Sequence, residues 1–234
     1  MTAIFKRECK AYFTSLITYF FLAAFFIAEG VLFYVLYQNG STATYAIPFS
    51  YPLYCAIFLI PLLTMRTISE DNRQKVDQVL LTAPVSVTDI VLGKFFACFS
   101  IYALAYAPTL IFQLIVSYHS TVNWALYLYS IFGTMLLGSV LIAMGIFISS
   151  LTESTALAAV LTIVTNLVLM FISSIAELAK VEWLTDAAEH IALLDRYANF
   201  GESVLNVADI VFFLSITVFC LFLCVRSVER RRWA

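Results

Sequence analysis

Residues 65–94 read MRTISEDNRQKVDQVLLTAPVSVTDIVLGK and form the longest charged segment between two apolar runs of the chain. Three apolar residues in it have the i, i+3, i+4 spacing of one helix face: Val76, Val79 and Leu80. Ala83-Pro84 ends this predicted helix, because the residue before a proline avoids helical dihedral angles. Residues 86–89 offer Ser, Thr and Asp side chains that predict an N-cap for the next helix. The segment 66–89 is therefore expected to contain a short amphipathic helix that lies between two membrane spans.

Apolar residues dominate the rest of the chain. Charged residues make up 12% of the sequence and hydrophobic residues 62%, whereas a soluble domain carries about 25% charged residues. Uncharged runs cover residues 30–65, 95–152 and 154–176, and a bilayer core requires about 20 apolar residues for each spanning helix. These features predict an all-α integral membrane protein with a single transmembrane domain over residues 1–234.

The apolar runs predict six transmembrane spans, at about 16–37, 47–65, 90–117, 125–148, 155–176 and 207–225. Residues 1–15 are expected to form an interfacial helix whose basic residues face anionic headgroups: Lys6, Arg7 and Lys10. Its apolar face is expected to contact lipid: Ile4, Phe5, Cys9, Tyr12 and Phe13. Pro108 predicts a kink in the third span, and residues 149–153 are expected to be a short cytosolic turn. Residues 177–206 carry an apolar stripe that predicts a helix on the outer face: Val181, Leu184, Ala188 and Ile191.

A stripe of small residues follows one side of the fourth predicted span: Ser130, Thr134, Gly138 and Gly145. Small side chains allow another helix to approach closely. We interpret this stripe as a helix-packing surface.

The basic residues are segregated along the chain. With six spans and both termini inside, only Lys180 and Arg196 lie outside. The cytosolic side then receives all the others: Lys6, Arg7, Lys10, Arg66, Arg73, Lys75, Lys94, Arg226, Arg230, Arg231 and Arg232. This distribution follows the positive-inside rule. It predicts a multi-pass membrane protein with both termini in the cytosol.

The motifs of several chemistries are missing from the sequence. Gly93-Lys94 is followed by Phe95, and no phosphate-binding loop motif occurs, so the chain is not expected to bind or hydrolyse ATP itself. The five cysteines are interpreted as apolar filler, and His119 and His190 are far apart, so no metal or cofactor site is predicted. Basic and aromatic surfaces for nucleic acid are also absent. We predict a protein that is not an enzyme.

Glu29 is the one ionisable residue deep within a predicted span. A charge at mid-bilayer costs at least about 2.5 kcal/mol, so Glu29 is expected to face protein or water. Two interpretations stay open: a residue of the transport pathway, or a structural carboxyl that holds two helices together. The predicted pathway combines Glu29 with polar residues of the fifth span: Thr162, Thr165 and Asn166.

The segments LLTAPVS and IVLGKF, preceded by the acid pair Glu70-Asp71, resemble the cytosolic segment of ABC-2-type permeases. These are membrane subunits of ATP-driven exporters. KRECKAYFTSLITYFFLA near the N-terminus resembles the opening of the gliding-motility-like branch of that family. DRYANFGESVLNVADIVFFLS resembles the same branch through four residues: Arg196, Tyr197, Phe200 and Asp209.

The resemblance implies a type V exporter-like fold with an elbow helix, a cytosolic coupling helix at 66–89 and an extracytoplasmic helical segment before the last span. It also implies a prokaryotic plasma (inner) membrane, a homo- or heterodimer of permease chains, and separate ABC ATPase subunits that bind ATP and Mg. Spans 1 and 5 would then flank the dimer interface and the transport route. The residues predicted to couple to the ATPase are Glu70, Asp71, Arg73, Lys75, Asp77, Leu80, Leu81 and Pro84.

Two other functions remain compatible with the sequence. In the first, ATP-driven motion reaches an extracytoplasmic accessory protein through residues 177–206, and nothing crosses the membrane. In the second, the chain is an ion-coupled carrier that uses Glu29 as its proton or ion site.

Overall fold

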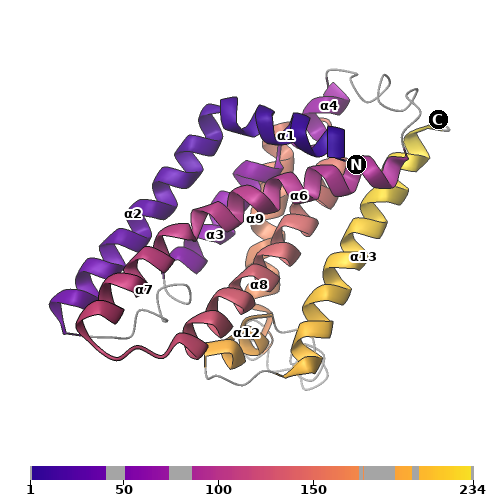
Figure 1. Ribbon diagram of the computed structural model, residues 1–234. Helices are drawn as coiled ribbons and strands as arrows, with labels where there is room; N and C mark the ends of the chain where they lie inside the picture. Colours follow the sequence, from indigo (N-terminus) through magenta and orange to yellow (C-terminus); the bar gives the residue numbers. More distant parts are fainter. Residues whose placement is uncertain are drawn as a thin grey trace.

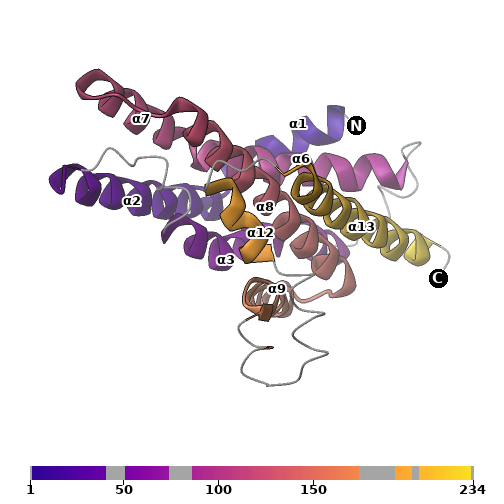
Figure 2. The same ribbon diagram turned by 90° about the horizontal axis from the view of Figure 1, so that it is seen from below.

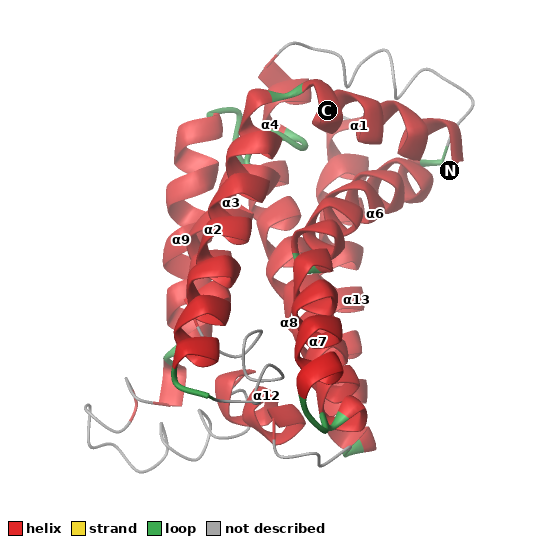
Figure 3. Ribbon diagram, turned by 60° about the vertical axis from the view of Figure 1, so that its left-hand side comes forward, coloured by secondary structure: helices red, strands yellow, loops and turns green. Residues whose placement is uncertain are grey.

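The structure, a computed structural model, describes residues 2–40, 51–73, 86–173, 176, 193–201 and 206–232. Within these ranges every regular element is a helix (Figure 3), which confirms the all-α fold class. The helices are α1 (Thr2–Thr14), α2 (Leu16–Gln38), α3 (Tyr51–Thr64), α4 (Ser69–Arg73), α6 (Val87–Ala105), α7 (Ala107–His119), α8 (Trp124–Leu151), α9 (Thr155–Met170), α12 (Leu193–Gly201) and α13 (Val207–Arg232).

Among the described residues, five helical segments are long and apolar enough to cross a membrane: Leu16–Gln38, Leu53–Asp71, Val87–His119, Trp124–Leu151 and Val207–Arg230. The remaining predicted span, 155–176, contains α9, whose 16 residues extend about 24 Å. A bilayer core is about 30 Å thick. In Figures 1 and 3, α9 nevertheless runs the length of the bundle beside α8. The prediction of six spans requires α9 to cross the membrane, and it therefore stays a prediction.

Polar residues between the apolar runs cap the N-termini of three helices. Ser86 Oγ accepts a hydrogen bond from Asp89 N at 3.1 Å, which confirms the predicted N-cap of α6. Asn123 Oδ1 accepts from Leu126 N at the start of α8, and Ser154 Oγ accepts from Leu157 N at the start of α9. Each side chain satisfies a backbone N–H that the helix cannot pair internally.

The predicted kink in the third span is a complete break. Helix α6 ends at Ala105, Tyr106 has φ −91° and ψ 1°, and α7 begins with Pro108 in its first turn. Proline has no N–H and its ring clashes with the carbonyl four residues earlier, so α6 cannot continue through it. Thr109 Oγ1 donates to Tyr106 O at 2.7 Å and thus stabilises the break.

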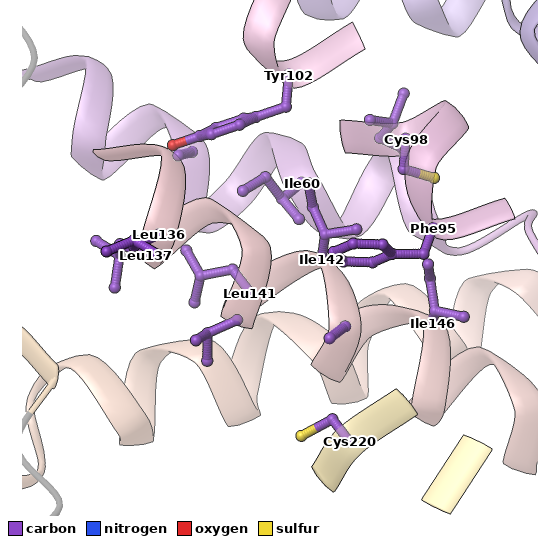
Figure 4. Close-up of a cluster of buried hydrophobic side chains, with 14 of the residues drawn as sticks. Ile60, Phe95, Cys98, Tyr102, Leu136, Leu137, Leu141, Ile142, Ile146 and Cys220 are labelled. Carbon is purple, nitrogen blue, oxygen red and sulfur yellow. The ribbon is translucent and has the colours of Figure 1, made fainter. Parts of the chain in front are cut away.

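Helix α8 is the centre of the bundle and packs against α3, α6, α9, α12 and α13 (Figures 1 and 2). A Cβ on Gly138 would lie 2.1 Å from Tyr102 Cε1 of α6, and one on Gly145 would lie 2.3 Å from Thr64 Oγ1 of α3. Both contacts require glycine, which confirms that the small residues of this helix serve packing. Side chains of α3, α6, α8 and α13 form the adjoining hydrophobic core (Figure 4).

The two ends of the bundle differ in what they carry. Helices α1 and α4 and both chain termini lie at one end, which we call the α1–α4 end; α12 lies at the opposite end (Figure 1). The predicted cytosolic turn at 149–153 is placed differently from our expectation. Ser149 and Ser150 are buried in the last turn of α8, and the actual turn consists of residues 152–154.

Candidate functional site

Lys94 is buried at the α1–α4 end, with 3% of its surface exposed. Its Nζ atom lies 2.6 Å from Asp71 Oδ2 on α4 and 3.4 Å from Glu8 Oε1 on α1, and it donates to Thr67 O at 2.5 Å. A buried ammonium group is tolerated only when opposite charges and acceptors surround it. This one side chain therefore ties together α1, α6 and the start of the segment 66–89.

The residue before Lys94 allows α1 to approach α6. A Cβ on Gly93 would lie 2.9 Å from Ile4 Cγ2 and 3.5 Å from Phe5 N. Ile4 is buried in this contact. The prediction that Ile4 faces lipid is therefore wrong, because the missing side chain at Gly93 leaves a space on α6 that Ile4 fills.

Tyr12 strengthens the same contact between helices. Its hydroxyl lies 2.9 Å from Cys98 Sγ of α6 and donates to Leu63 O of α3 at 3.3 Å. Burial of the hydroxyl raises the pKa of Tyr12 well above its usual value, and Cys98 adds to the rise, so the phenol stays protonated. Tyr12 thus points into the protein, and the expectation that it contacts lipid is also wrong.

Ser149 of α8 holds the other side of the turn between α3 and α4. Its Oγ accepts from Ile68 N at 3.2 Å and from Ser69 N at 3.0 Å, and it donates to Met65 O at 3.2 Å. All of these backbone groups belong to the turn that begins the charged segment. Residues 65–71 are therefore fastened to α8 by Ser149 and to α6 and α1 by Lys94.

A polar cavity of about 230 Å³ opens between α1 and this turn. Arg66 and Glu70 line it and lie 3.7 Å apart, and both are well exposed, so their pair contributes at most about 1 kcal/mol. Lys94 and Asp71 also line it. The cavity therefore presents exposed charges of both signs. Beside them lies the buried Lys94, whose contacts join α6 to α1 and α4.

The predicted coupling residues are only partly described by the structure. Glu70 and Arg73 lie on α4, whereas Asp71 is held by Lys94 and serves the internal contact. The other predicted coupling residues lie outside the described residues: Lys75, Asp77, Leu80, Leu81 and Pro84. Sequence reasoning placed Ser149 in the predicted turn at 149–153 but missed its contact with the charged segment. It also missed the role of Lys94, although a lysine inside a predicted span is itself a signal of a buried partner.

A second cluster lies at the α12 end and contains the residues that carried the resemblance in the last third of the chain. Arg196 Nη1 lies 3.0 Å from Asp209 Oδ1, and Asn199 Nδ2 donates to Asp209 Oδ2 at 2.9 Å. Tyr197 OH lies 2.8 Å from Thr134 Oγ1 of α8. A Cβ on Gly133 would lie 2.7 Å from Phe200 Cβ. These contacts join α12 to α8 and to the start of α13.

Glu29 is fully buried in α2, and neither carboxylate oxygen has a hydrogen-bond partner among the described residues. Phe25, one turn earlier, packs edge-on against Tyr102 and Tyr106 at the break between α6 and α7. The carboxyl group therefore lies inside the bundle, on the side of α2 that faces this break.

The other predicted pathway residues lie on a different helix. Thr162 and Asn166 are buried in α9, and Thr165 is half-buried. Helix α9 packs on α3 and α8, whereas α2 packs on α3 and α6, so α3 lies between α2 and α9 (Figure 2). The structure does not bring Glu29 and the α9 residues together within one chain. A shared pathway stays a prediction.

Within the described ranges, His, Cys, Asp and Glu side chains do not gather into a group that could hold a metal ion. The chain is instead a bundle of apolar helices with an ion pair between helices at each of its two ends. The long apolar helices define an integral membrane protein. The family model described as ABC-2 family transporter protein matches residues 33–227. The chain belongs to that family and is a membrane permease subunit of an ABC transporter. Comparison with curated proteins finds no match.

Proposed function

We propose that the chain is the permease subunit of an exporter, and that separate ATPase subunits drive it by docking on residues 66–89. One observation carries this proposal: residues 65–71 are fastened to α6 and α1 through Lys94 and to α8 through Ser149. A force applied to the charged segment is thus transmitted to three helices at once. The ATPase subunits bind the ATP and Mg, and two permease chains, identical or similar, form the dimer.

The distribution of charges supports an orientation with the α1–α4 end in the cytosol. Several exposed basic residues lie at this end: Lys6, Arg7, Lys10, Arg66, Arg226 and Arg230. Arg196 lies at the α12 end and is paired with Asp209. Basic residues accumulate on the cytosolic side of membrane proteins. We therefore propose a prokaryotic plasma membrane with both termini cytosolic.

The docking proposal is tested by reversing charges on α4. The variant Glu70→Arg with Arg73→Glu, co-expressed with its ATPase, is expected to insert normally and to lose ATP-dependent motion of the membrane domain. That motion is read as a change in maleimide labelling at Asn206→Cys, an exposed position at the α12 end. The matched control, Lys10→Glu, reverses an exposed charge on α1 at the same end and is expected to keep the response.

Two results contradict the proposal. Nucleotide binding or hydrolysis by the purified chain alone is one, because the ATPase activity is assigned to a partner. An unchanged ATP-dependent labelling response in the Glu70 and Arg73 variant is the other, since it removes α4 from the docking surface.

A mechanical function is a second candidate, favoured by the contacts of α12 with α8 and α13. In this case motion reaches an extracytoplasmic accessory protein, and nothing crosses the membrane.

The burial of Glu29 without a described partner favours an ion-coupled carrier instead. Flux into vesicles separates the three functions: an exporter requires ATP, a carrier responds to a pH gradient without ATP, and a mechanical module shows no flux.

A further inference from the structure

An apolar groove runs along α13 and meets α6 near the α1–α4 end. Its first part, a cavity of about 410 Å³, lies between Val91 and Leu92 of α6 and the last turns of α13. A second cavity of about 540 Å³ continues along α13 and shares Val218 and Phe222 with the first. Helices α6 and α13 lie side by side here (Figure 2). The two cavities therefore adjoin at these two side chains.

The length of the first cavity corresponds to one leaflet of a membrane. It extends along α13 from Val218 to Glu229, which is about 16 Å at the helical rise per residue. Half of a bilayer core is about 15 Å. An acyl chain that enters this groove at its polar end thus remains within a single leaflet.

The polar end of the groove carries positive charge. Arg226 lies there with 67% of its side chain exposed and its guanidinium 5.3 Å from the centre of the Phe222 ring. Its contact with Glu229 is also exposed, so it is weak and opens easily. Arg230 follows on α13, with Arg231 and Arg232 next in sequence. The arginines outnumber the one acid of this turn.

We propose that the groove between α6 and α13 binds one anionic phospholipid, with its phosphate at Arg226 and an acyl chain along Val218 and Phe222. Basic residues at a membrane surface attract anionic headgroups by about 1 kcal/mol each. A second copy of the chain fits less well. Two copies in the same orientation that met at this groove would bring their arginine clusters to the same depth, where like charges repel.

The proposal uses the orientation proposed above only to name the leaflet, which is the cytosolic one. Lipid binding does not depend on an ATPase or on transport. If the chain binds no lipid in the groove, the docking proposal is therefore unaffected. If the docking proposal fails, lipid binding in the groove is likewise unaffected.

The test titrates the delipidated full-length chain in detergent with phosphatidylglycerol or phosphatidylcholine and follows its thermal unfolding. Phosphatidylglycerol is expected to raise Tm in a saturable way, with about one lipid retained per chain in native mass spectrometry. Arg226→Gln is expected to weaken this binding about fivefold, which corresponds to one lost headgroup contact, and Arg226→Lys to restore most of it. Lys10→Gln, which removes an exposed charge on α1, serves as the charge control.

A groove-filling variant tests the position of the acyl chain. Val218→Trp is expected to reduce phosphatidylglycerol binding, whereas Val164→Trp on the exposed side of α9 leaves it unchanged; the two valines are 64% and 52% exposed. Equal stabilisation by both lipids overturns the proposal. Undiminished phosphatidylglycerol binding by Arg226→Gln also overturns the proposal. A change of oligomeric state in Val218→Trp overturns it as well, because it would assign the groove to a second copy of the chain.

Discussion

At the scale of single residues, Lys94 is the position where one substitution has the widest structural effect. Lys94→Met leaves Asp71 and Glu8 without their buried counter-charge. Removing one partner of a buried ion pair costs about 3–5 kcal/mol, and the partial exposure of Asp71 places the expected loss near the lower value. The measurement is the free energy of unfolding in detergent, or the fall in Tm.

The double variant Lys94→Met with Asp71→Asn provides the control for this prediction. It removes both charges of the closest pair, so it is expected to recover part of the lost stability. Glu229→Gln, which breaks an exposed pair, is expected to change stability by less than about 0.5 kcal/mol. Equal losses in the single and double variants would show that Lys94 and Asp71 do not interact.

Cys9 provides a pH-dependent prediction on α1, outside the spans. Burial raises the pKa of its thiol above the usual value, and the neighbouring Glu8 carboxylate adds to the rise. The thiolate is the reactive form, so alkylation of Cys9 is expected to be slow at neutral pH. The alkylation rate of a free cysteine, with a pKa of about 8.5, approaches its plateau as the pH rises above that value. At the same pH the alkylation rate of Cys9 should still be rising.

The measurement is the rate of iodoacetamide modification against pH in a Cys55→Ser background, because the other three cysteines are buried. Glu8→Gln removes the smaller cause of the shift and is expected to move the profile toward lower pH. A wild-type profile that coincides with that of a free thiol would contradict the prediction.

At the scale of helices, glycines of α8 decide how closely the neighbouring helices approach. Gly138→Ala places a methyl group on the ring of Tyr102, which is fully buried and donates to Thr134 O at 3.1 Å. The ring cannot move without breaking this contact, so a loss of about 1–3 kcal/mol is expected, as for an overpacked core. Thermal unfolding of the purified variant is the measurement.

Gly30→Ala is the matched control, because a Cβ at this position of α2 meets nothing within 4 Å. It is expected to preserve or slightly raise stability, since alanine favours a helix by about 1 kcal/mol over glycine. A Gly138→Ala variant as stable as Gly30→Ala would mean that α6 and α8 separate easily at this point.

At the scale of the whole molecule, the two ends of the bundle are expected to lie on opposite sides of the membrane. In a background without native cysteines, Ser86→Cys and Glu153→Cys should react with an impermeant maleimide only from the cytosol. Ala198→Cys on α12 should react only from outside. All three positions are exposed, and labelling of intact cells against inverted vesicles gives the side.

The same labelling determines whether α9 is a span. Only one apolar helix, α9, is described between Glu153 and Ala198, so labelling from opposite sides means that the chain crosses the membrane there. Labelling of both from one side would exclude α9 as a span. Labelling of Ser86→Cys from outside would invert the orientation and remove the docking surface from the cytosol.

Much of the fold follows from the sequence, because its determinants are local. The length of an apolar run predicts a membrane helix, and Pro108 predicted a kink at the place where α6 ends. The polar residues at 86–89 predicted that the helix starts there, and the structure shows that Ser86 is the one that caps it. The small residues of α8 also predicted a packing surface correctly, although not which side chain would meet each of them. Properties of this kind depend on neighbours within a few residues and persist in any arrangement of the helices.

The sequence by itself determined that this chain is an all-helical membrane protein, and it predicted that most of its basic residues lie on one side of the membrane. Only the tertiary structure decided that Lys94 joins Glu8 to Asp71, and that Tyr12 points at Cys98, 86 positions away in sequence. Such contacts depend on how each helix is rotated and how closely it approaches its neighbours. Rotation and approach are set by the packing of all the helices together, and for that reason Ile4 of α1 packs on Gly93 instead of facing lipid.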